Sequence, residues 1–460
     1  MLELGICLSL ILAYGNTEVE PENLSIATFR VDATPPLDTP LCGGGVEPAK
    51  KIIDRLTVRG VIFITDESPV LLCAVDWVGI GNSGQDEWKK ELAKSAGTTP
   101  DRVCVHTVHQ HDTPGCDFAA EEMLSEHGIG GSMFMVEFTR HTITRTSEAI
   151  RQALKSPVEV THMSVGKAKV EKVASNRRVL GPDGKVKHVR YSSCRDEEAI
   201  AAPEGVIDPY LRNIIFWCSE HAIVSMTYYA THPQSFYGSG AVSTDFVGMA
   251  RSIREATLPD VFHIHFNGAG GNVAAGKYND GSPVNRLILA QRMLEGMEKA
   301  WENAVKIPIV ADDLKWKTIP VALPLRDHLV NGEEELEKTL SDPDADIRSR
   351  IRAARDLVWT QGCKSGQKIQ LSCLQLSDTY IIHMPGELFV EYQLASQEML
   401  PDKTVCMAAY GDYGPGYIGT EISYSQGGYE TSYVSRVAPQ VEKVLMEAMR
   451  KLLISDNPAK

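Results

Sequence analysis

Apolar runs and amphipathic stretches alternate along this chain. A nearly continuous apolar run such as residues 70–78 is typical of a buried strand, whereas residues 86–97 place apolar side chains every three to four positions, as an amphipathic helix does. Strand-like runs occur at residues 60–65, 70–78, 102–109, 213–218, 222–230 and 261–266, and helix-like periods at residues 86–97, 134–155, 244–257, 285–304 and 433–453. The alternation predicts the α/β class, with mixed β-sheets flanked by helices.

Two polar stretches interrupt this alternation. Residues 181–205 are rich in turn-forming residues and predict a long surface loop near a site. Residues 333–360 are charged with a helical period, which predicts an exposed helical excursion. Neither stretch has the composition of a linker between domains, so we expect a single catalytic domain over residues 24–455.

The first 23 residues contain an apolar stretch, LGICLSLILAYG, of about the length of a secretory signal core. The basic residues that usually precede such a core are absent, so residues 1–23 are typical of either a signal peptide or a disordered tail. The segment slightly favours a secreted or periplasmic location over a cytoplasmic one. No apolar run reaches the ~18 residues of a membrane span, so we expect no transmembrane segment.

Charge and cysteine usage narrow the classes of function. The net charge is −14 and the basic residues form no runs, which argues against a nucleic-acid partner. The ten cysteines include no C-x-x-C pair, so they fit neither a disulfide framework nor a structural zinc knot. Most have apolar neighbours and are typical of buried thiols. The sequence carries no signal for an oligomeric state.

Four separated segments each end a strand-like run in a residue type that binds zinc. They supply His109 with His111, then His232, Glu387 and Tyr417. Side chains drawn from distant segments at strand ends are the usual construction of a catalytic metal site. Taken singly, the signals are weak, because the histidines also fit hydrogen-bonded structural residues and Glu387 also fits a surface or helix-terminal charge.

Three further features accompany these segments. Asp245 is predicted to cap the next helix, with support of a ligand imidazole as the alternative. His383 lies four residues before Glu387, and we interpret it as a core residue. Five tyrosines between Tyr410 and Tyr429 fit either an aromatic wall for a substrate or packing beneath a long loop.

A glycine-rich turn, HFNGAGGNVAAG, follows another strand-like run. It lacks the Gly-Lys-Ser/Thr of a phosphate-binding loop and the helix and later acid of a dinucleotide fingerprint. Its glycines either permit positive φ angles or let backbone amides approach a ligand. We expect a substrate-binding or oxyanion-stabilising turn that includes Gly271, Asn272 and Ala274.

Taken together, these segments resemble the neutral ceramidase family, the zinc-dependent amidases that cleave the N-acyl bond of ceramide. Residues 109–115 correspond to the family's H-T-H-S-G-P-G segment, residues 232–235 to its HPTS segment and residues 385–387 to its Pro-Gly-Glu turn. Residues 176–177 correspond to its Asn-Arg pair, and residues 417–430 to its tyrosine motif Y-x6-Y-x4-Y-E. The matches occur in the family's order and cover nearly the whole chain. The resemblance implies a neutral-ceramidase-like catalytic domain.

The resemblance also implies the members of the site. One zinc ion per chain would be held by His109, His232, Glu387 and Tyr417. The residues facing the scissile group would be His111, Arg177 and Tyr429. The implied activity is hydrolysis of an N-acyl amide by a metal-activated water, with a small-molecule or lipid-like acyl compound as substrate.

Two departures from the family pattern weaken the case for ceramide itself. Ala274 stands where the family's G-D-V-S-P-N segment has its serine, and we expect no C-terminal immunoglobulin-like domain. A metal-activated water needs no serine, so Ala274 is compatible with hydrolysis. Two alternatives stay open: hydrolysis of a different bond, such as an ester or a bond in a carbohydrate-derived substrate, and a non-catalytic binding protein that retains the metal.

Overall fold

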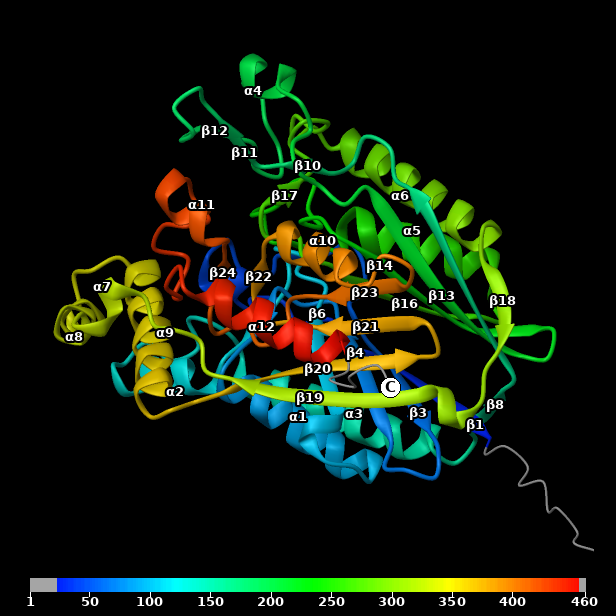
Figure 1. Cartoon of the computed structure of the whole chain (residues 1–460). Coiled ribbons are helices and arrows are strands. Elements are labelled where there is room, and N and C mark those ends of the chain that lie inside the picture. Colours follow the sequence, from blue (N-terminus) through cyan, green and yellow to red (C-terminus); the bar gives the residue numbers. More distant parts are fainter. Residues whose placement is uncertain (1–22, 455–460) are drawn as a thin grey trace, which may run out of the picture.

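The computed structural model describes residues 23–454, so the expectation for the N-terminal 22 residues lies outside the described part of the chain. Three β-sheets meet around a shared apolar core, and helices cover their outer faces (Figure 1). This is the mixed α/β architecture with flanking helices that the alternation of apolar patterns predicted.

The first sheet has the strand order β6-β4-β3-β1-β8. Its strands are β1 (Leu24–Asp32), β3 (Thr57–Ile64), β4 (Val70–Val75), β6 (Val103–Thr107) and β8 (Val158–Val160). Every residue of β4 is buried, which explains its uninterrupted apolar sequence. Helices α1 (Ser83–Ala96) and α3 (Val136–Ala153) pack against the outer face of this sheet.

The second sheet has the order β16-β14-β13-β9-β18. Its strands are β9 (His162–Lys169), β13 (Tyr210–Cys218), β14 (His221–Tyr229), β16 (Phe262–Asn267) and β18 (Val305–Pro308). Helices α5 (Asp245–Thr257) and α6 (Val284–Glu302) cover it and contribute apolar side chains to its core.

The third sheet has the order β19-β20-β21-β23. Its strands are β19 (Leu314–Val321), β20 (Ile369–Leu376), β21 (Thr379–His383) and β23 (Thr404–Ala408). The closing amphipathic helix expected near the C-terminus is α12 (Val441–Leu453), whose apolar face packs on this sheet. Helix α10 (Val390–Glu398) lies beside it.

Shorter elements complete the fold. Two-stranded ladders join β2 (Lys51–Ile52) with β15 (Ala241–Val242), β5 (Gly79–Ile80) with β7 (Gly115–Cys116), β10 (Ser175–Asn176) with β17 (Val273–Ala274), β11 (Arg178–Leu180) with β12 (Val186–Val189), and β22 (Glu387–Leu388) with β24 (Tyr417–Ile418). The remaining helices are α2 (Phe118–Glu126), α4 (Glu197–Ala201), α7 (Asp327–Val330), α8 (Glu333–Ser341), α9 (Ile347–Lys364) and α11 (Glu421–Gln426), with 3-10 turns η1 (Cys42–Gly44), η2 (Pro100–Arg102) and η3 (Ala311–Asp313).

The three sheets approach one another through their parallel strand pairs. Each sheet contains one such pair, β4–β6, β14–β16 or β21–β23. Aromatic packing links the first two sheets, since the rings of Phe63 and Phe216 meet edge to face with centroids 5.4 Å apart. Parallel strands end on the same edge of a sheet, so the segments that follow these pairs emerge close together, as ligand-binding loops of α/β proteins commonly do.

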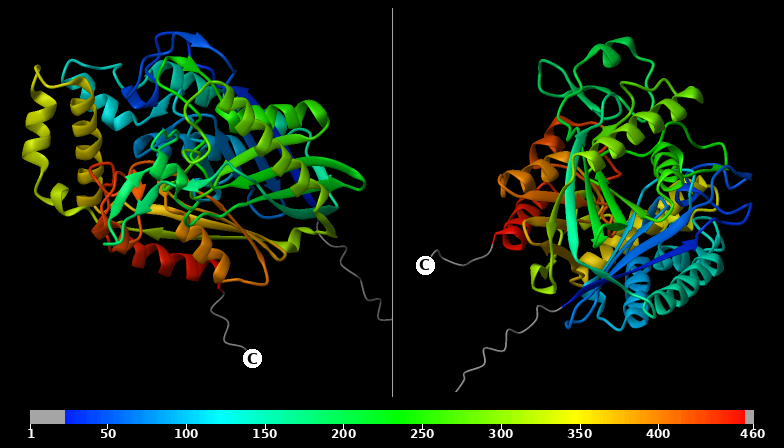
Figure 2. Two further views of the ribbon diagram at one scale, coloured as in Figure 1. Left: turned by 90° about the horizontal axis from the view of Figure 1, so that it is seen from above. Right: turned by 90° about the vertical axis from the view of Figure 1, so that its right-hand side faces the viewer.

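Two segments differ from their sequence-based expectation. Within residues 181–205 the chain forms part of the β11–β12 hairpin and helix α4. Arg190 is buried there and donates to the backbone carbonyls of Asn176, before the segment, and Pro203, near its end. Within residues 333–360 helices α8 and α9 form a hairpin at one end of the molecule (Figure 2). Only one face of α9 is exposed, because Ile351 and Leu357 pack into the core beneath the first sheet.

No helix within residues 23–454 combines the length and the apolar character needed to cross a membrane. All nine cysteines of the described part are free thiols, as their scattered positions predicted. Burial raises the pKa of the Cys73 thiol well above its ordinary value, and it raises that of Cys406 to about 12, so these thiols are protonated core residues.

A buried ion pair fastens the first sheet to α5. The carboxylate of Asp76 accepts hydrogen bonds from both terminal nitrogens of Arg251, at 2.9 and 2.7 Å, and from the backbone and side chain of Thr57. Burial alone raises the pKa of Asp76, but Arg251 and Thr57 more than offset this and lower the pKa to about 2. The carboxylate is therefore ionised in the folded protein at every ordinary pH.

Replacing this carboxylate should destabilise the protein strongly. Asp76→Asn leaves the buried Arg251 without an anion, and we expect the free energy of unfolding to fall by about 3–5 kcal/mol in urea titrations. Because the folded pKa of Asp76 lies below its unfolded value of about 3.9, the difference between wild type and variant should be complete above pH 4 and shrink as the pH falls toward 2. The exposed pair Arg55–Asp32 gives the control, where Asp32→Asn should cost less than about 1 kcal/mol. Equal losses in the two variants would contradict this account.

Candidate metal centre and active site

His109 and His111 follow the carboxyl end of β6. The backbone turns sharply at His109, which has φ +74°, and its amide donates to Trp77 O at 2.9 Å. Their i, i+2 spacing would place both rings on one face of an extended strand, but the chain is not extended here. The left-handed turn brings them together instead, with their Nε2 atoms 3.3 Å apart. A left-handed conformation at a residue other than glycine is strained and is typical of functional sites.

His232 follows β14, an interior strand that pairs with β16. Its amide donates to Val273 O at 2.8 Å, and its Nδ1 lies 2.6 Å from Gly270 O. Asp245 does not contact the imidazole: its carboxylate accepts from the Ser235 amide at 3.0 Å and pairs with Arg286. It also accepts from the amide of the next residue in the first turn of α5, so it anchors both the helix start and the loop after His232.

Glu387 and Tyr417 are brought together by backbone pairing. They are direct partners in the parallel ladder β22–β24, and the Glu387 amide donates to Gly416 O at 2.9 Å. Gly386 precedes the pair with φ +61°, a conformation that favours glycine in the Pro-Gly-Glu turn. The hydroxyl of Tyr413 donates to Glu387 Oε1 at 2.7 Å, which leaves Oε2 for other contacts.

The four residues that the family resemblance nominates as ligands converge on one point. Glu387 Oε2 lies 3.2 Å from His109 Nε2 and 3.0 Å from His232 Nε2. The hydroxyl of Tyr417 lies 3.1 Å from His232 Nε2. All four side chains are buried, although they come from segments up to 308 residues apart, as Tyr417 and His109 are.

The hydrogen bonds behind the histidines define which atoms face this point. Val78 O lies 2.5 Å from Nδ1 of His109, and Gly270 O is the corresponding partner of His232. A carbonyl oxygen only accepts, so each Nδ1 carries a proton and donates. With Nδ1 committed to a carbonyl, each imidazole directs its Nε2 toward Glu387. Backbone carbonyls in this position commonly orient histidine ligands of metals.

The pKa values of the groups around this point are shifted strongly from their ordinary values. Burial lowers the pKa of His232, and it lowers the pKa of His111 well below the ordinary value, with the other imidazoles adding to the effect. Burial raises the pKa of Glu387, but the positive charge that His109 and His232 can carry more than offsets it and holds that pKa well below its usual range. Burial raises the pKa of Tyr417 well above that of a free phenol.

Arg177 lies beside the centre, between Tyr417 and Glu430. Its NH1 donates to the Tyr417 hydroxyl at 3.0 Å, and its Nε faces Glu430 Oε1 at 3.1 Å. Glu430 also pairs with Arg178 at 3.2 Å, and it is completely buried. The ring of Tyr429 covers the guanidinium of Arg177, 5.6 Å from its centroid. Through these contacts Arg177 holds Tyr417 in place, and its guanidinium does not line the open cavity.

The glycine-rich turn supports the centre from behind. The Gly271 amide donates to Leu388 O at 2.8 Å, and the Asn272 side chain bonds Glu391 and the Val390 amide. Ala274 is buried in the β10–β17 ladder. These contacts occupy the Gly271 amide and the Asn272 side chain, so neither group is free to donate to a substrate oxyanion.

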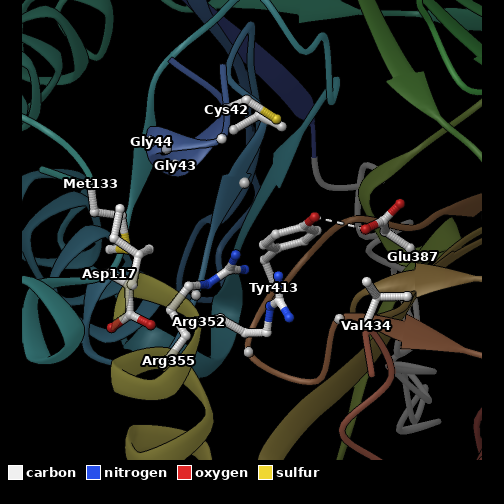
Figure 3. Close-up of a pocket in the computed structure, with 18 of the residues that line it drawn as sticks. Cys42, Gly43, Gly44, Asp117, Met133, Arg352, Arg355, Glu387, Tyr413 and Val434 are labelled. Carbon is white, nitrogen blue, oxygen red and sulfur yellow. Dashed lines mark hydrogen bonds between the residues drawn. The ribbon is translucent and has the colours of Figure 1, made fainter. Parts of the chain in front are cut away.

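A cavity of about 350 Å³ opens onto the centre, a size found among small-molecule sites. His111, Glu387, Tyr417 and Tyr429 form part of its wall. The rest of the wall includes residues that the sequence did not nominate, among them Asn82. Figure 3 shows four others, Cys42, Tyr413, Arg352 and Arg355. Tyr413 belongs to the tyrosine-rich segment, which fits its expected use as an aromatic wall, whereas nothing in the sequence linked the arginines to this site.

Two histidine-containing groups in the described part are compact enough to share an ion. One is formed by His109, His111 and His232, and the other by Cys104, His106 and His383, which are buried between the first and third sheets. His383 is thus a core residue, as interpreted from the sequence, and burial lowers its pKa well below the ordinary value. Ser372 bridges the sulfur of Cys104 and Nδ1 of His383.

Comparison with solved structures identifies the architecture. The chain is similar to the neutral ceramidase from Pseudomonas aeruginosa, with a TM-score of 0.69 and 14% sequence identity over 95% of this chain and 75% of that one. It is equally similar to a ceramidase complexed with C2, over 94% of this chain and 75% of that one. No protein-family model matches the chain, and no curated protein matches it by sequence. The fold is therefore that of a neutral ceramidase. At 14% sequence identity the likeness shows the fold alone.

Close packing behind the centre yields a prediction for Gly271. A Cβ at this position would lie 2.2 Å from Glu387 O, a backbone atom that cannot move without displacing the β22 strand. We expect Gly271→Ala to lower the free energy of unfolding by about 2–3 kcal/mol in urea titrations. Gly115→Ala is the matched control, because its Cβ would meet only ordinary contacts of 3.4 Å or more and should cost less than about 1 kcal/mol. Equal stability of the two variants would show that the turn is not tightly packed against β22.

Proposed function

We propose that this protein is a zinc-dependent hydrolase that cleaves N-acyl amides. The observation that carries the proposal is the convergence of four donor atoms, His109 Nε2, His232 Nε2, Glu387 Oε2 and the Tyr417 hydroxyl. Imidazole lone pairs and a carboxylate oxygen repel one another at 3.0–3.2 Å unless a proton or a cation lies between them. The ceramidase-like fold independently supports amide hydrolysis as the reaction class.

The residues present fit zinc. Neighbouring ligands of a tetrahedral zinc ion with bonds of about 2.0–2.1 Å lie roughly 3.3–3.4 Å apart, close to the separations of these donors. Histidine nitrogen and carboxylate oxygen are common zinc ligands, and both imidazoles already have their Nδ1 protons committed to backbone carbonyls. When bound, zinc supplies a water ligand with a pKa near 7 and polarises a substrate carbonyl.

Three side chains around this centre would assist the reaction. His111 Nε2 lies 3.3 Å from the ligand nitrogen of His109, and its Nδ1 is buried without a hydrogen-bond partner in the described part. The imidazole can therefore take a proton at one nitrogen and deliver it to the leaving amine. Burial raises the pKa of Tyr429, so its hydroxyl stays protonated and can donate to the carbonyl oxygen. Arg177 would act as a positioning residue that orients the phenol of Tyr417.

No serine nucleophile is part of this proposal. Ala274 is enclosed in the β10–β17 ladder, and its carbonyl accepts from the Ser175 hydroxyl at 2.9 Å. The attacking oxygen would therefore come from water. Hydrolysis of an ester would use the same groups, so acyl esters belong in the same substrate panel.

Zinc content tests the ligand set. Wild type should purify with about one zinc per chain, and His232→Ala should bind zinc at least about tenfold more weakly, because it loses a ligand nitrogen. Mass spectrometry of the metal, together with competition against a chelator, measures both. His221→Ala, which removes an exposed histidine at the start of β14, should retain zinc, and so should His111→Ala. Zinc retained by His232→Ala would contradict the ligand set, and zinc lost from His111→Ala would add His111 to it.

Turnover of acyl amides tests the reaction. Release of carboxylic acid from a panel of N-acyl amides and esters should stop when zinc is removed by a chelator and return when zinc is restored. We expect His111→Asn to lower kcat by about 10²–10³, with zinc still bound, because proton transfer is lost. Ala274→Ser serves as the comparison and should not be needed for activity. If amides are cleaved only after Ala274→Ser, the water-based mechanism is wrong.

A further inference from the structure

Three arginines of α9 line the cavity on one side of the helix. Arg348, Arg352 and Arg355 are spaced four and three residues apart, so they project from one face. Arg355 is half-buried, and the other two are exposed at the cavity mouth. Figure 3 shows the guanidinium groups of Arg352 and Arg355 beside Tyr413, with Glu387 on the other side of that ring.

These arginines differ from other arginines near the cavity. Arg436 pairs with Asp356 at 2.6 Å, and Arg350 donates to two backbone carbonyls. In the described part of the chain no carboxylate forms an ion pair with Arg348, Arg352 or Arg355. Two of them instead lie over aromatic rings, Arg352 at 4.2 Å from the Tyr433 centroid and Arg355 at 5.4 Å from that of Tyr413. A stacked guanidinium keeps the N–H groups of its edge available for an anion.

The acidic groups of the cavity are already engaged. Asp117 lines it, but its carboxylate accepts from the Asn82 side chain at 2.6 Å and from the Ala120 amide. Glu387 belongs to the metal centre. The wall contains four arginines, Arg348, Arg352, Arg355 and Arg436, against these two carboxylates, so it has a surplus of positive charge, although the chain as a whole carries a net charge of −14. A surplus of this kind inside a concave wall attracts anions selectively.

The ring of Tyr413 sets the distance between the arginines and the centre. Its hydroxyl donates to Glu387 Oε1 at 2.7 Å, while its face lies against Arg355. A cationic group thus stands one tyrosine side chain away from the proposed ligands. That spacing suits a compact molecule whose scissile amide is at the centre and whose anionic group lies a few bonds away.

From this geometry we infer that the substrate is an anionic acyl amide, an inference that rests on the proposed function. Its carboxylate or phosphate would be held by the guanidinium forks of Arg352 and Arg355, with Arg348 at the entrance. Arginine binds both groups with paired hydrogen bonds, and such bonds are stronger than those between neutral partners. This distinguishes the expected substrate from an uncharged lipid amide such as ceramide.

Pairs of amides that differ in whether they carry an anionic group isolate the effect of the charge on turnover. We would measure kcat/KM of the zinc-loaded protein for three anionic amides: N-hexanoylglycine, N-hexanoyl-O-phosphoethanolamine and the monopropylamide of glutaric acid. They place a carboxylate or a phosphate on the amine side, or a carboxylate on the acyl side. Their neutral counterparts are N-hexanoylglycinamide, N-hexanoylethanolamine and the methyl ester of the glutaric amide. At least one anionic member should be preferred over its counterpart by about tenfold or more.

Removing the arginines should abolish that preference. In Arg352→Met with Arg355→Met, the ratio of kcat/KM between the preferred anionic amide and its counterpart should fall by about tenfold to a hundredfold, the range expected for one or two lost hydrogen bonds to a charged group. Arg145→Met is the matched control, because it removes an exposed arginine of α3 outside the cavity and should leave the ratio unchanged. An unchanged ratio in the double variant, or no preference in wild type, would overturn the inference.

Binding without turnover distinguishes this inference from the proposed function. Calorimetric titration of the chelator-treated full-length chain with each anionic amide measures binding when no hydrolysis occurs. Suppose that the protein hydrolyses no amide but binds an anionic amide, and that the double variant binds it about tenfold or more weakly. This result would support the anion site and refute the amidase. Hydrolysis of amides with no such binding would support the amidase and refute the anion site.

Discussion

The arrangement of acceptor atoms around Glu387 Oε2 is the constraint on which the rest of this structure depends. Two imidazole lone pairs, a carboxylate oxygen and a phenol oxygen share a small buried volume, and the backbone carbonyls behind the histidines fix which atoms face inward. Lone pairs held this close cost free energy unless a proton or a cation lies between them, so the surrounding fold must impose the geometry. Such over-determination is typical of a preorganised metal site.

The fold imposes the geometry of these four groups through strand ends and short ladders. The parallel strands β6 and β14 deliver their histidines at the edge where the sheets meet, and the ladder β22–β24 sets Glu387 directly beside Tyr417. Behind them, Arg177 is enclosed by Glu430 and the tyrosine rings. The strained backbone at His109 persists because its amide and imidazole are both hydrogen-bonded to the segment after β4.

Charge is distributed unevenly over the molecule. The chain as a whole carries a net charge of −14, whereas the cavity next to the centre is lined by arginines from α9 that have no carboxylate ion-pair partner in the described part of the chain. Helix α9 has two roles at once, since its apolar face contributes to the core under the first sheet and its basic face closes one side of the cavity. The cavity thus combines the proposed metal centre with a wall suited to an anion.

The sequence by itself determined the class of fold and the identity of the residues at the centre. Periodic apolar patterns placed most strands and helices, because burial on one or both faces dictates the spacing of apolar side chains. Motif order brought His109, His232, Glu387 and Tyr417 to attention, and the structure brings all four together. Only the tertiary structure decided that a left-handed turn joins His109 to His111, that Arg177 holds a tyrosine, and that a charged helical excursion forms the cavity wall. These features depend on contacts between segments far apart in the chain, and local periodicity carries no information about such contacts.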